Sequence, residues 1–381
     1  MTSEQLKKRI HSIDIMRGVV ILLMLVDHVR ERFFLHMQVS DPMVIETTSP
    51  GLFWSRFAAH FCAPAFIFLT GMSAWLYQHA RQGQPRSATG FLLKRGLFII
   101  ALEVTLISYS WMGSYHTLWL QVMWAIGLCM LVLAILHKLP MPVLLTLGLT
   151  IVFTHNMLTP IEFNENEWGY TLWRILHDRG YILETSWLNV KVSYPVLPWI
   201  GVILLGYCAG PLYGKGIAKP RRQAWLLGLA LICVLLFALL RGGNIYGETL
   251  PWHSFDSAMQ TTMSIFNITK YPPSLSFLLI TLAGMFVGLY VFEKPLGSVT
   301  NMLRTFGSVP MFFYVVHLYV LLALYQAAYW LVGNNQGEYV GVNHIAWIWL
   351  IAVLLAVALY LPVKWFSDYK RTHHQWWLKY L

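Results

Sequence analysis

Charged residues are scarce in this sequence. Asp, Glu, Lys and Arg make up 12% of the 381 residues, whereas hydrophobic residues make up 57% and the mean hydropathy is +0.56. A soluble domain needs about 25% charged residues to cover its surface. The shortage excludes an ordinary soluble domain and indicates that lipid surrounds most of the chain.

Cysteine is also scarce. The sequence has four, and all of them lie inside apolar segments: Cys62, Cys129, Cys208 and Cys233. None has the CxxC or histidine-paired spacing that a zinc site requires, and the set does not suggest a disulfide framework. We interpret them as small core residues and expect no bound metal.

The net charge of +10 comes from basic residues in short runs between apolar stretches. Such runs are signals of membrane orientation rather than a surface for nucleic acid. The first run, Lys7-Lys8-Arg9, precedes an apolar stretch as in a signal peptide. No small-residue cleavage site follows, so we expect a retained first helix.

The apolar stretches predict an all-α, polytopic membrane bundle. A helix needs about 20 mostly apolar residues to cross about 30 Å of hydrocarbon. Ten segments qualify: 14–30, 57–78, 91–111, 117–137, 141–156, 194–213, 224–240, 274–293, 308–331 and 344–365. The fifth is the weakest, because it is short and begins with Pro140 and Pro142.

The placement of Lys and Arg predicts that both termini are cytoplasmic, because most of the 27 then fall on the cytoplasmic side. We expect a cytoplasmic segment 1–13, one transmembrane domain 14–366 and a cytoplasmic tail 367–381. Three outer loops are long, namely 31–56, 157–193 and 241–273. Within the second, 168–176 has helical spacing of apolar residues and is expected to lie along the membrane surface.

The first helix contains ionisable residues, and placing one near the middle of a membrane costs about 2.5–3.5 kcal/mol of insertion free energy. Arg17 and His28 are 11 positions apart, so they project from nearly the same face, about 16 Å apart along the axis. Asp14 lies one turn before Arg17, and Asp27 points away from this face. The helix therefore carries a guanidinium near its cytoplasmic side and an imidazole near its outer side.

This pair has two interpretations. In the first, Arg17 is an orientation anchor and His28 an interfacial histidine. In the second, Arg17 binds phosphates, since arginine stays charged and binds them bidentately, and His28 moves a proton. A phosphopantetheine arm would bridge such a gap, so the second interpretation points to an acyl-CoA donor.

The sequence resembles the bacterial branch of the heparan-α-glucosaminide N-acetyltransferase-like family. Arg17-x10-His28, inside Ser12-Ile13-Asp14-Ile15-Met16-Arg17-Gly18 and Asp27-His28, is similar to the signature of the wider membrane acyltransferase superfamily. Further segments fit in order along most of the chain: His60-Phe61-Cys62-Ala63-Pro64, Phe66 to Gly71, Leu120-Gln121, Gly206 to Gly210, Lys270 to Ser276 and Tyr314-Val315-Val316-His317.

The resemblance implies acetylation of a glycan from acetyl-CoA as co-substrate, in the inner membrane of a bacterium. His28 is then the expected base, oriented by Asp27 or Glu103, and Arg17 with Asp14 marks the donor site. The lysosomal branch has Asn at the position of His28 and its histidine farther along. His36 and His60 therefore stay open as alternatives for the base.

Other polar residues are expected near the outer surface, where they would bind the acceptor: Gln121, Asn156, Asn244, Asn267 and Lys270, together with His317 in the ninth helix. Taken singly, each of these residues is more often an ordinary polar residue at the membrane interface than a ligand-binding residue. Glu103 and His60 likewise have structural alternatives, as a buried acid that joins helices and as a core histidine.

We therefore predict an enzyme that moves acetyl from cytoplasmic acetyl-CoA to an amino or hydroxyl group of a sugar at the outer side. The alternative is a transporter or exporter of a small polar solute, with Arg17, Glu103 and the histidines along its path. A third class is a non-catalytic factor in polysaccharide assembly. The expected partners are lipid, acetyl-CoA and the glycan, but no nucleic acid. A homo-oligomer stays open.

Overall fold

The computed structural model describes residues 10–80, 86–214, 216–294, 297–373 and 375–378. Each of the ten predicted segments contains a helix: α1 (His11–Phe33), α2 (Pro50–Ala59) with α3 (Cys62–Gln78), α4 (Thr89–Leu102) with α5 (Ser108–Met112), α6 (Val122–Leu136), α7 (Met141–Thr154), α9 (Leu197–Ala209), α10 (Lys219–Gly242), α12 (Leu275–Val291), α14 (Pro310–Val332) and α15 (Ile345–Thr372).

Five stretches in the described residues are long and apolar enough to cross a membrane: Pro50–Gln78, Met141–Leu158, Lys219–Gly242, Pro310–Val332 and Ile345–Thr372. Shorter apolar helices, Val122–Leu136, Leu197–Tyr213 and Leu275–Val291, lie among them. The chain is therefore an integral membrane protein with several spans. The predicted segment 141–156, expected to be the weakest, lies within one of the five, Met141–Leu158.

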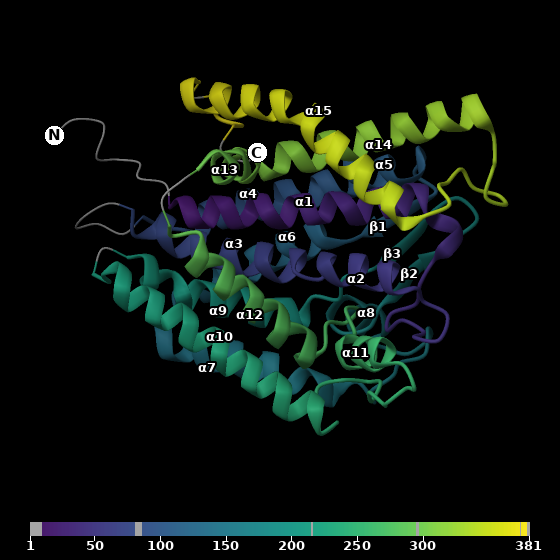
Figure 1. Ribbon diagram of the computed structural model, residues 1–381. Coiled ribbons are helices and arrows are strands. Elements are labelled where there is room, and N and C mark those ends of the chain that lie inside the picture. The colour runs from purple at the N-terminus through teal and green to yellow at the C-terminus, as the bar shows by residue number, and fades with distance from the viewer. Residues whose placement is uncertain (1–9, 81–85, 215, 295–296, 374, 379–381) are drawn as a thin grey trace.

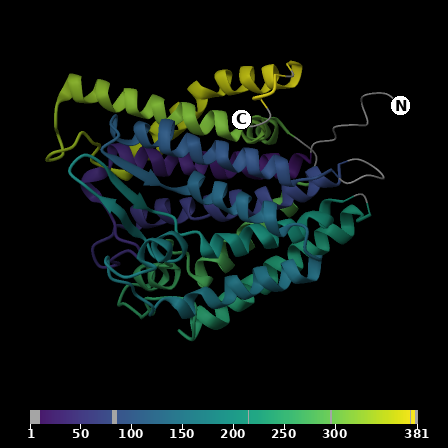
Figure 2. The ribbon, with the colours of Figure 1, turned by 180° about the vertical axis from the view of Figure 1, so that it is seen from behind.

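Helix α1 runs through the middle of the bundle, with α14 on one side and α3 on the other (Figure 1). We call its two ends the Arg17 end and the His28 end. The small strands and the helices α8 (Tyr170–Leu176) and α11 (Ala258–Phe266) gather at the His28 end, as both views show (Figures 1 and 2). The three long loops therefore build one structure at that end.

The all-α prediction is wrong at the His28 end, where three short strands form a sheet in the order β1-β3-β2. They are β1 (Thr117–Leu120), β2 (Gly180–Glu184) and β3 (Asn189–Val192), with β1 parallel and β2 antiparallel to β3. Residues 117–120 were expected to open the fourth helix. Pairing with the loop after α8 holds them extended instead, so this helix begins at Val122.

Other short elements depart from the predicted segments. The second span is interrupted between α2 and α3, and the third contains the π-helical turn η3 (Glu103–Ile107). In the described residues, 3-10 turns extend the ends of α1, α7 and α9: η2 (Leu35–Met37), η4 (His155–Leu158) and η5 (Gly210–Tyr213). The helix α13 (Ser298–Ser308) is unpredicted. The predicted surface helix at 168–176 is confirmed as a helix in α8.

Close packing around α1 depends on glycine. A Cβ added at Gly18 would collide with the Leu303 carbonyl of α13, and one at Gly307 would collide with the Asp14 carbonyl of α1. Small residues let backbones approach in this way where lipid offers no hydrophobic driving force between helices. The two glycines therefore hold α13 directly against the Arg17 end of α1.

Several predicted features lie outside the described residues. Residues 1–9 of the expected cytoplasmic segment fall there, as do the basic residues Arg81 and Lys215 and positions 374 and 379–381 of the expected tail.

Candidate functional site

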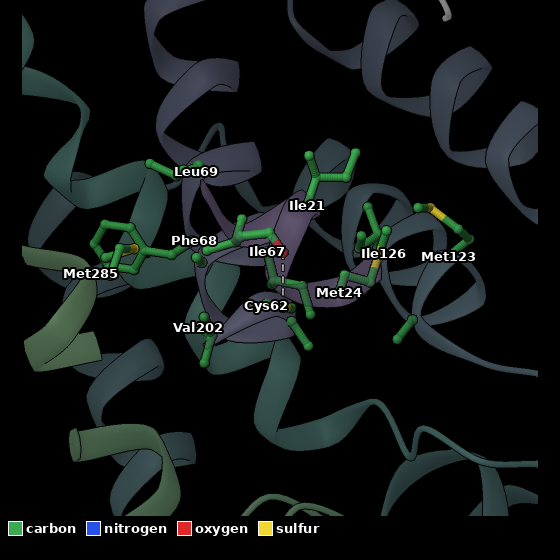
Figure 3. Close-up of a cluster of buried hydrophobic side chains, with 14 of the residues drawn as sticks. Ile21, Met24, Cys62, Ile67, Phe68, Leu69, Met123, Ile126, Val202 and Met285 are labelled. Carbon is green, nitrogen blue, oxygen red and sulfur yellow. Dashed lines mark hydrogen bonds between the residues drawn. The ribbon is translucent and has the colours of Figure 1, made fainter. Parts of the chain in front are cut away.

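A cavity of about 520 Å³ lies at the His28 end. Its walls come from α1, α2, α3, α5, β1, α6, β3, α14 and the segment before α12. Met24, Cys62 and Met123 line it from the side of the hydrophobic core, where they pack with the apolar residues that Figure 3 shows. The cavity is thus apolar on the side toward the bundle and polar toward the loops.

His28 lines this cavity and is held from behind by His317 of α14. The His28 Nδ1 and the His317 Nε2 are 2.7 Å apart, and the His317 Nδ1 lies 2.7 Å from the Phe313 carbonyl oxygen. The two imidazoles are stacked, with ring centroids 5.0 Å apart. A chain of two hydrogen bonds therefore runs from the backbone of α14 to the cavity.

Two further aromatic rings stand edge-on against His28. The Trp111 ring lies 5.2 Å from it at 84°, and the Tyr314 ring lies 5.8 Å from it at 79°, centroid to centroid. Both residues line the cavity and both are buried. His28 is therefore fixed on three sides by rings of α5 and α14.

Asp27 turns away from His28 into a group of charges. Its Oδ1 accepts from the Arg30 Nε at 2.9 Å, and its Oδ2 lies 4.0 Å from the Lys270 Nζ. In the described contacts neither Asp27 nor Glu103 bonds to His28, whereas His317 does.

Glu103 is fully buried at the start of η3. Its Oε2 accepts from the backbone nitrogens of Met123 at 2.9 Å and Trp124 at 3.1 Å. These nitrogens belong to the first turn of α6, whose N–H groups have no partner within the helix. Glu103 therefore caps α6, just behind the cavity wall that Met123 forms.

Lys270 and Gln121 line the cavity, as expected for acceptor residues. Lys270 is buried, with its Nζ over the Tyr271 ring at 5.1 Å and its backbone nitrogen bonded to Asp41 at 3.0 Å. Burial lowers the pKa of Lys270, but Tyr271 and Asp27 outweigh it, and the pKa lies above its ordinary value. The ammonium therefore stays charged.

Asn156, Asn244 and Asn267 are not brought to the cavity. Their amides hold loop backbone instead: Asn156 accepts from the Leu275 nitrogen, Asn244 exchanges two hydrogen bonds with Trp252, and Asn267 exchanges two with Met43. These contacts fix the long loops at the His28 end. His317 also lies behind the cavity wall rather than on it, so its contact is with His28.

The alternative bases lie away from the cavity lining. His60 is 1% exposed and packs against the rings of Phe57 and Phe277. His36 packs against Phe34 at the end of α1. Of the three candidate histidines, only His28 is among the described residues that line the cavity.

Arg17 lies at the other end of α1, facing α3. Its Nη2 donates to the Ser73 hydroxyl at 2.6 Å and approaches the Leu69 carbonyl at 3.4 Å, and its Nη1 lies 3.5 Å from the Asp14 carboxylate. Arg95 of α4 lies close enough for the two positive charges to interact. Asp14 thus positions Arg17, and the Arg17 end carries two neighbouring guanidinium groups.

Sequence reasoning missed several residues of the cavity. Trp111 and Tyr314 are among them, and so are two cations at the loop side, Arg179 and Lys191. Lys191 lies between Tyr181 and Trp119 on paired strands, with its Nζ 4.6 Å and 5.4 Å from their ring centroids. Burial, and secondly the charge of Arg179, lower the pKa of Lys191.

The sequence profile of the family described as heparan-alpha-glucosaminide N-acetyltransferase, catalytic, matches residues 9–226. The match covers more than half of the 381 residues, including Arg17 and His28. The chain belongs to this family. No curated protein sequence matches it.

Membership in this family implies acetyl-CoA-dependent N-acetyltransferase activity, with acetyl-CoA as the donor substrate. The matched region contains α1 and the cavity walls up to α9, whereas His317, Tyr314 and Lys270 lie beyond its end. The cavity therefore joins the family region to the helices that follow it.

Proposed function

We propose that the protein transfers the acetyl group of acetyl-CoA to an amino or hydroxyl group of a sugar, with His28 as the general base. The donor phosphates bind at the Arg17 end from the cytoplasm, and the sugar enters the cavity at the His28 end from the outer side. The protein lies in the inner membrane of a bacterium.

The hydrogen-bond chain behind His28 carries this proposal. The Phe313 carbonyl can only accept, so the His317 Nδ1 carries a proton and the His317 Nε2 has a lone pair. That lone pair accepts from the His28 Nδ1, which leaves the His28 Nε2 unprotonated. The neighbouring hydrogen bonds thus set the tautomer in which a neutral histidine accepts a proton on the other nitrogen.

The chemistry follows from this tautomer. The His28 Nε2 takes the proton from the sugar nitrogen or oxygen as that atom bonds to the acetyl carbon. The carbon–sulfur bond then breaks, and the coenzyme A thiolate receives the proton from His28. His28 ends in its starting state, and the products are the acetylated sugar and coenzyme A.

The donor reaches His28 along α1. Arg17 and His28 are 11 residues apart in one helix, about 16 Å at 1.5 Å per residue. Phosphate oxygens at the Arg17 end would accept hydrogen bonds from the Arg17 guanidinium, which is planar and permanently charged. A pantetheine arm extended from there brings the thioester to the imidazole.

The acceptor side has the polar lining that a sugar needs. Gln121, Lys270 and Ser193 line the cavity with side-chain hydrogen-bonding groups, and Lys191 stands at the loop side. A sugar in the cavity can therefore direct its hydroxyl groups toward these side chains and its reacting group toward His28.

Radiolabelled acetyl-CoA and a panel of amino sugars test the proposal with purified protein in detergent. The wild-type protein should bind acetyl-CoA and label an acceptor. In His28→Ala, binding should persist while transfer falls about 10²–10⁴-fold, the usual contribution of a positioned acid–base group. His36→Ala and His60→Ala are matched controls that should retain transfer.

Two results would overturn parts of the proposal. Transfer that survives in His28→Ala but is lost in His36→Ala or His60→Ala would move the base and leave the reaction class standing. Failure of the wild-type protein to bind acetyl-CoA, with uptake of a solute into vesicles, would favour the transporter.

A further inference from the structure

Two buried hydrogen-bond donors beside His28 have no hydrogen-bond acceptor among the described residues. They are the Tyr314 hydroxyl and the Trp111 indole Nε1. Tyr314 is 1% exposed and Trp111 is 9% exposed. A buried polar group without a partner costs about 1–3 kcal/mol, so such groups usually have a use or a missing partner.

Both residues line the same cavity, and both rings contact His28 edge-on. They come from different parts of the chain: Trp111 lies in the last turn of α5 and Tyr314 in the second turn of α14, and these two helices pack against each other. The fold therefore brings together two independent donors around one imidazole. An indole N–H can only donate, and it lacks any role as a base.

We propose that Tyr314 and Trp111 donate hydrogen bonds to the carbonyl oxygen of the acetyl thioester and stabilise the negative charge that develops on it. This inference rests on the proposed function and adds two catalytic residues to it. Fixed donors aimed at a developing oxyanion in a site that excludes water are among the largest catalytic terms.

The step balances without a further reactant. As the sugar nitrogen or oxygen bonds to the acetyl carbon, the electron pair of the carbonyl double bond moves onto its oxygen, and His28 takes the proton of the attacking atom. When that electron pair returns, the carbon–sulfur bond breaks and His28 protonates the thiolate. Tyr314 and Trp111 keep their protons throughout and only donate hydrogen bonds.

The surroundings support a role with the acyl group rather than with the sugar. Both donors stand on the side of the cavity that His28 and α14 form, whereas Lys191 and Lys270 come from the loop side. The positive charge of Arg32, whose guanidinium lies 5.6 Å from the Trp111 ring centroid, adds to the potential that favours an oxyanion.

The variants Tyr314→Phe and Trp111→Phe test this proposal, since each removes one donor and keeps an aromatic ring. Each should lower kcat about 10²–10³-fold, as for loss of one oxyanion donor, with the affinity for acetyl-CoA unchanged. Trp124→Phe and Tyr207→Phe are matched controls, because these residues lie outside the described cavity lining. They should keep wild-type kcat.

A spectroscopic readout separates this role from a structural one. With acetyl-CoA labelled with ¹³C at the carbonyl, the infrared carbonyl stretch in the wild-type complex should lie below that of free acetyl-CoA, and Tyr314→Phe should shift it back. An unchanged stretch and an unchanged kcat in Tyr314→Phe would overturn the proposal. Tyr314→Phe therefore tests the proposed hydrogen bond to the carbonyl oxygen even if Trp111→Phe does not fold.

Wild-type protein that does not bind or use acetyl-CoA would remove the proposed function itself. Wild-type transfer together with normal transfer by both variants would remove only the oxyanion role.

Discussion

His28 and His317 are 289 positions apart in the chain, yet their ring nitrogens Nδ1 and Nε2 are 2.7 Å apart. The contact joins α1 to α14 in the interior of the bundle. Because His317 is itself bonded to the backbone of α14, the protein backbone determines which nitrogen of His28 carries the proton.

We predict that His317→Ala lowers kcat while acetyl-CoA affinity stays within twofold of wild type. Without its acceptor, the His28 Nδ1–H no longer has a fixed partner, and the tautomer that exposes a basic Nε2 loses its advantage. A loss of about 10²–10⁴-fold is expected, as when the group that sets a catalytic histidine's tautomer is changed. Single-turnover transfer and acetyl-CoA titration measure the two quantities.

His317→Gln is the matched control, because its amide oxygen can accept from His28. It should recover part of the rate. Equal rates in the Ala and Gln variants would show that His317 acts through packing alone.

At the Arg17 end, Arg17→Ala should weaken acetyl-CoA binding by about 1–3 kcal/mol, the range for a charge-assisted hydrogen bond. Arg17→Lys should recover only part of it, since lysine lacks the planar, bidentate geometry. Calorimetric titration in detergent is the measurement. Arg371→Ala, which removes an exposed cation that pairs with Asp368, should bind normally. Normal binding by Arg17→Ala would return Arg17 to an anchoring role.

The orientation of the bundle can be read with single reporter tags. We expect tags at both termini and at Lys219 to report cytoplasm, and tags at Glu165 and Asp256 to report the outer side. The loops around α8 and α11 lie together at the His28 end, so their tags should agree (Figure 1). A C-terminal tag on the outer side would contradict the even number of spans.

A pH effect on stability is expected from Glu248, which holds the segment that carries Lys270. Its carboxyl group accepts from the Thr269 nitrogen at 3.0 Å and the Thr269 hydroxyl at 3.2 Å. Burial raises the pKa of Glu248 to about 7 from an ordinary value of 4.5. The fold therefore favours the protonated form, and this stabilisation is complete below pH 4.5 and lost as pH rises through 7.

A pKa raised from 4.5 to about 7 corresponds to about 3.4 kcal/mol of unfolding free energy in full, of which about 2–3 kcal/mol is lost between pH 5 and pH 8. Glu248→Gln keeps a neutral side chain and should remove the dependence. Thermal unfolding of both proteins between pH 5 and pH 8 measures it. Parallel curves for the two proteins would show that Glu248 does not titrate in this range.

The helices were predictable because a membrane-spanning helix leaves a strong compositional signal: about 20 apolar residues in a row. The sheet was not, because its strands are four or five residues long and β1 directly precedes the apolar run of α6. The strands form only when β3 pairs with residues about 70 positions earlier. Such pairing depends on tertiary contacts that no local pattern contains.

The site was predictable in part for a similar reason. His28 and Arg17 share one helix, so their spacing alone placed them on one face. The contact of His28 with His317 and the positions of Trp111 and Tyr314 depend on how α5 and α14 pack on α1. Asn156, Asn244 and Asn267 were predicted to bind the acceptor because they are polar and lie near the outer surface, yet their amides bond to backbone groups.

The distance in sequence between His28 and His317 also has a consequence for how the protein is made. At about 5–20 residues per second, a ribosome needs roughly 15–60 s to add the 289 residues from Val29 to His317. Throughout this interval α1 resides in the membrane without the partner that sets the protonation of its histidine. Under the proposed function, transfer therefore begins only after α14 has been inserted and has docked against α1.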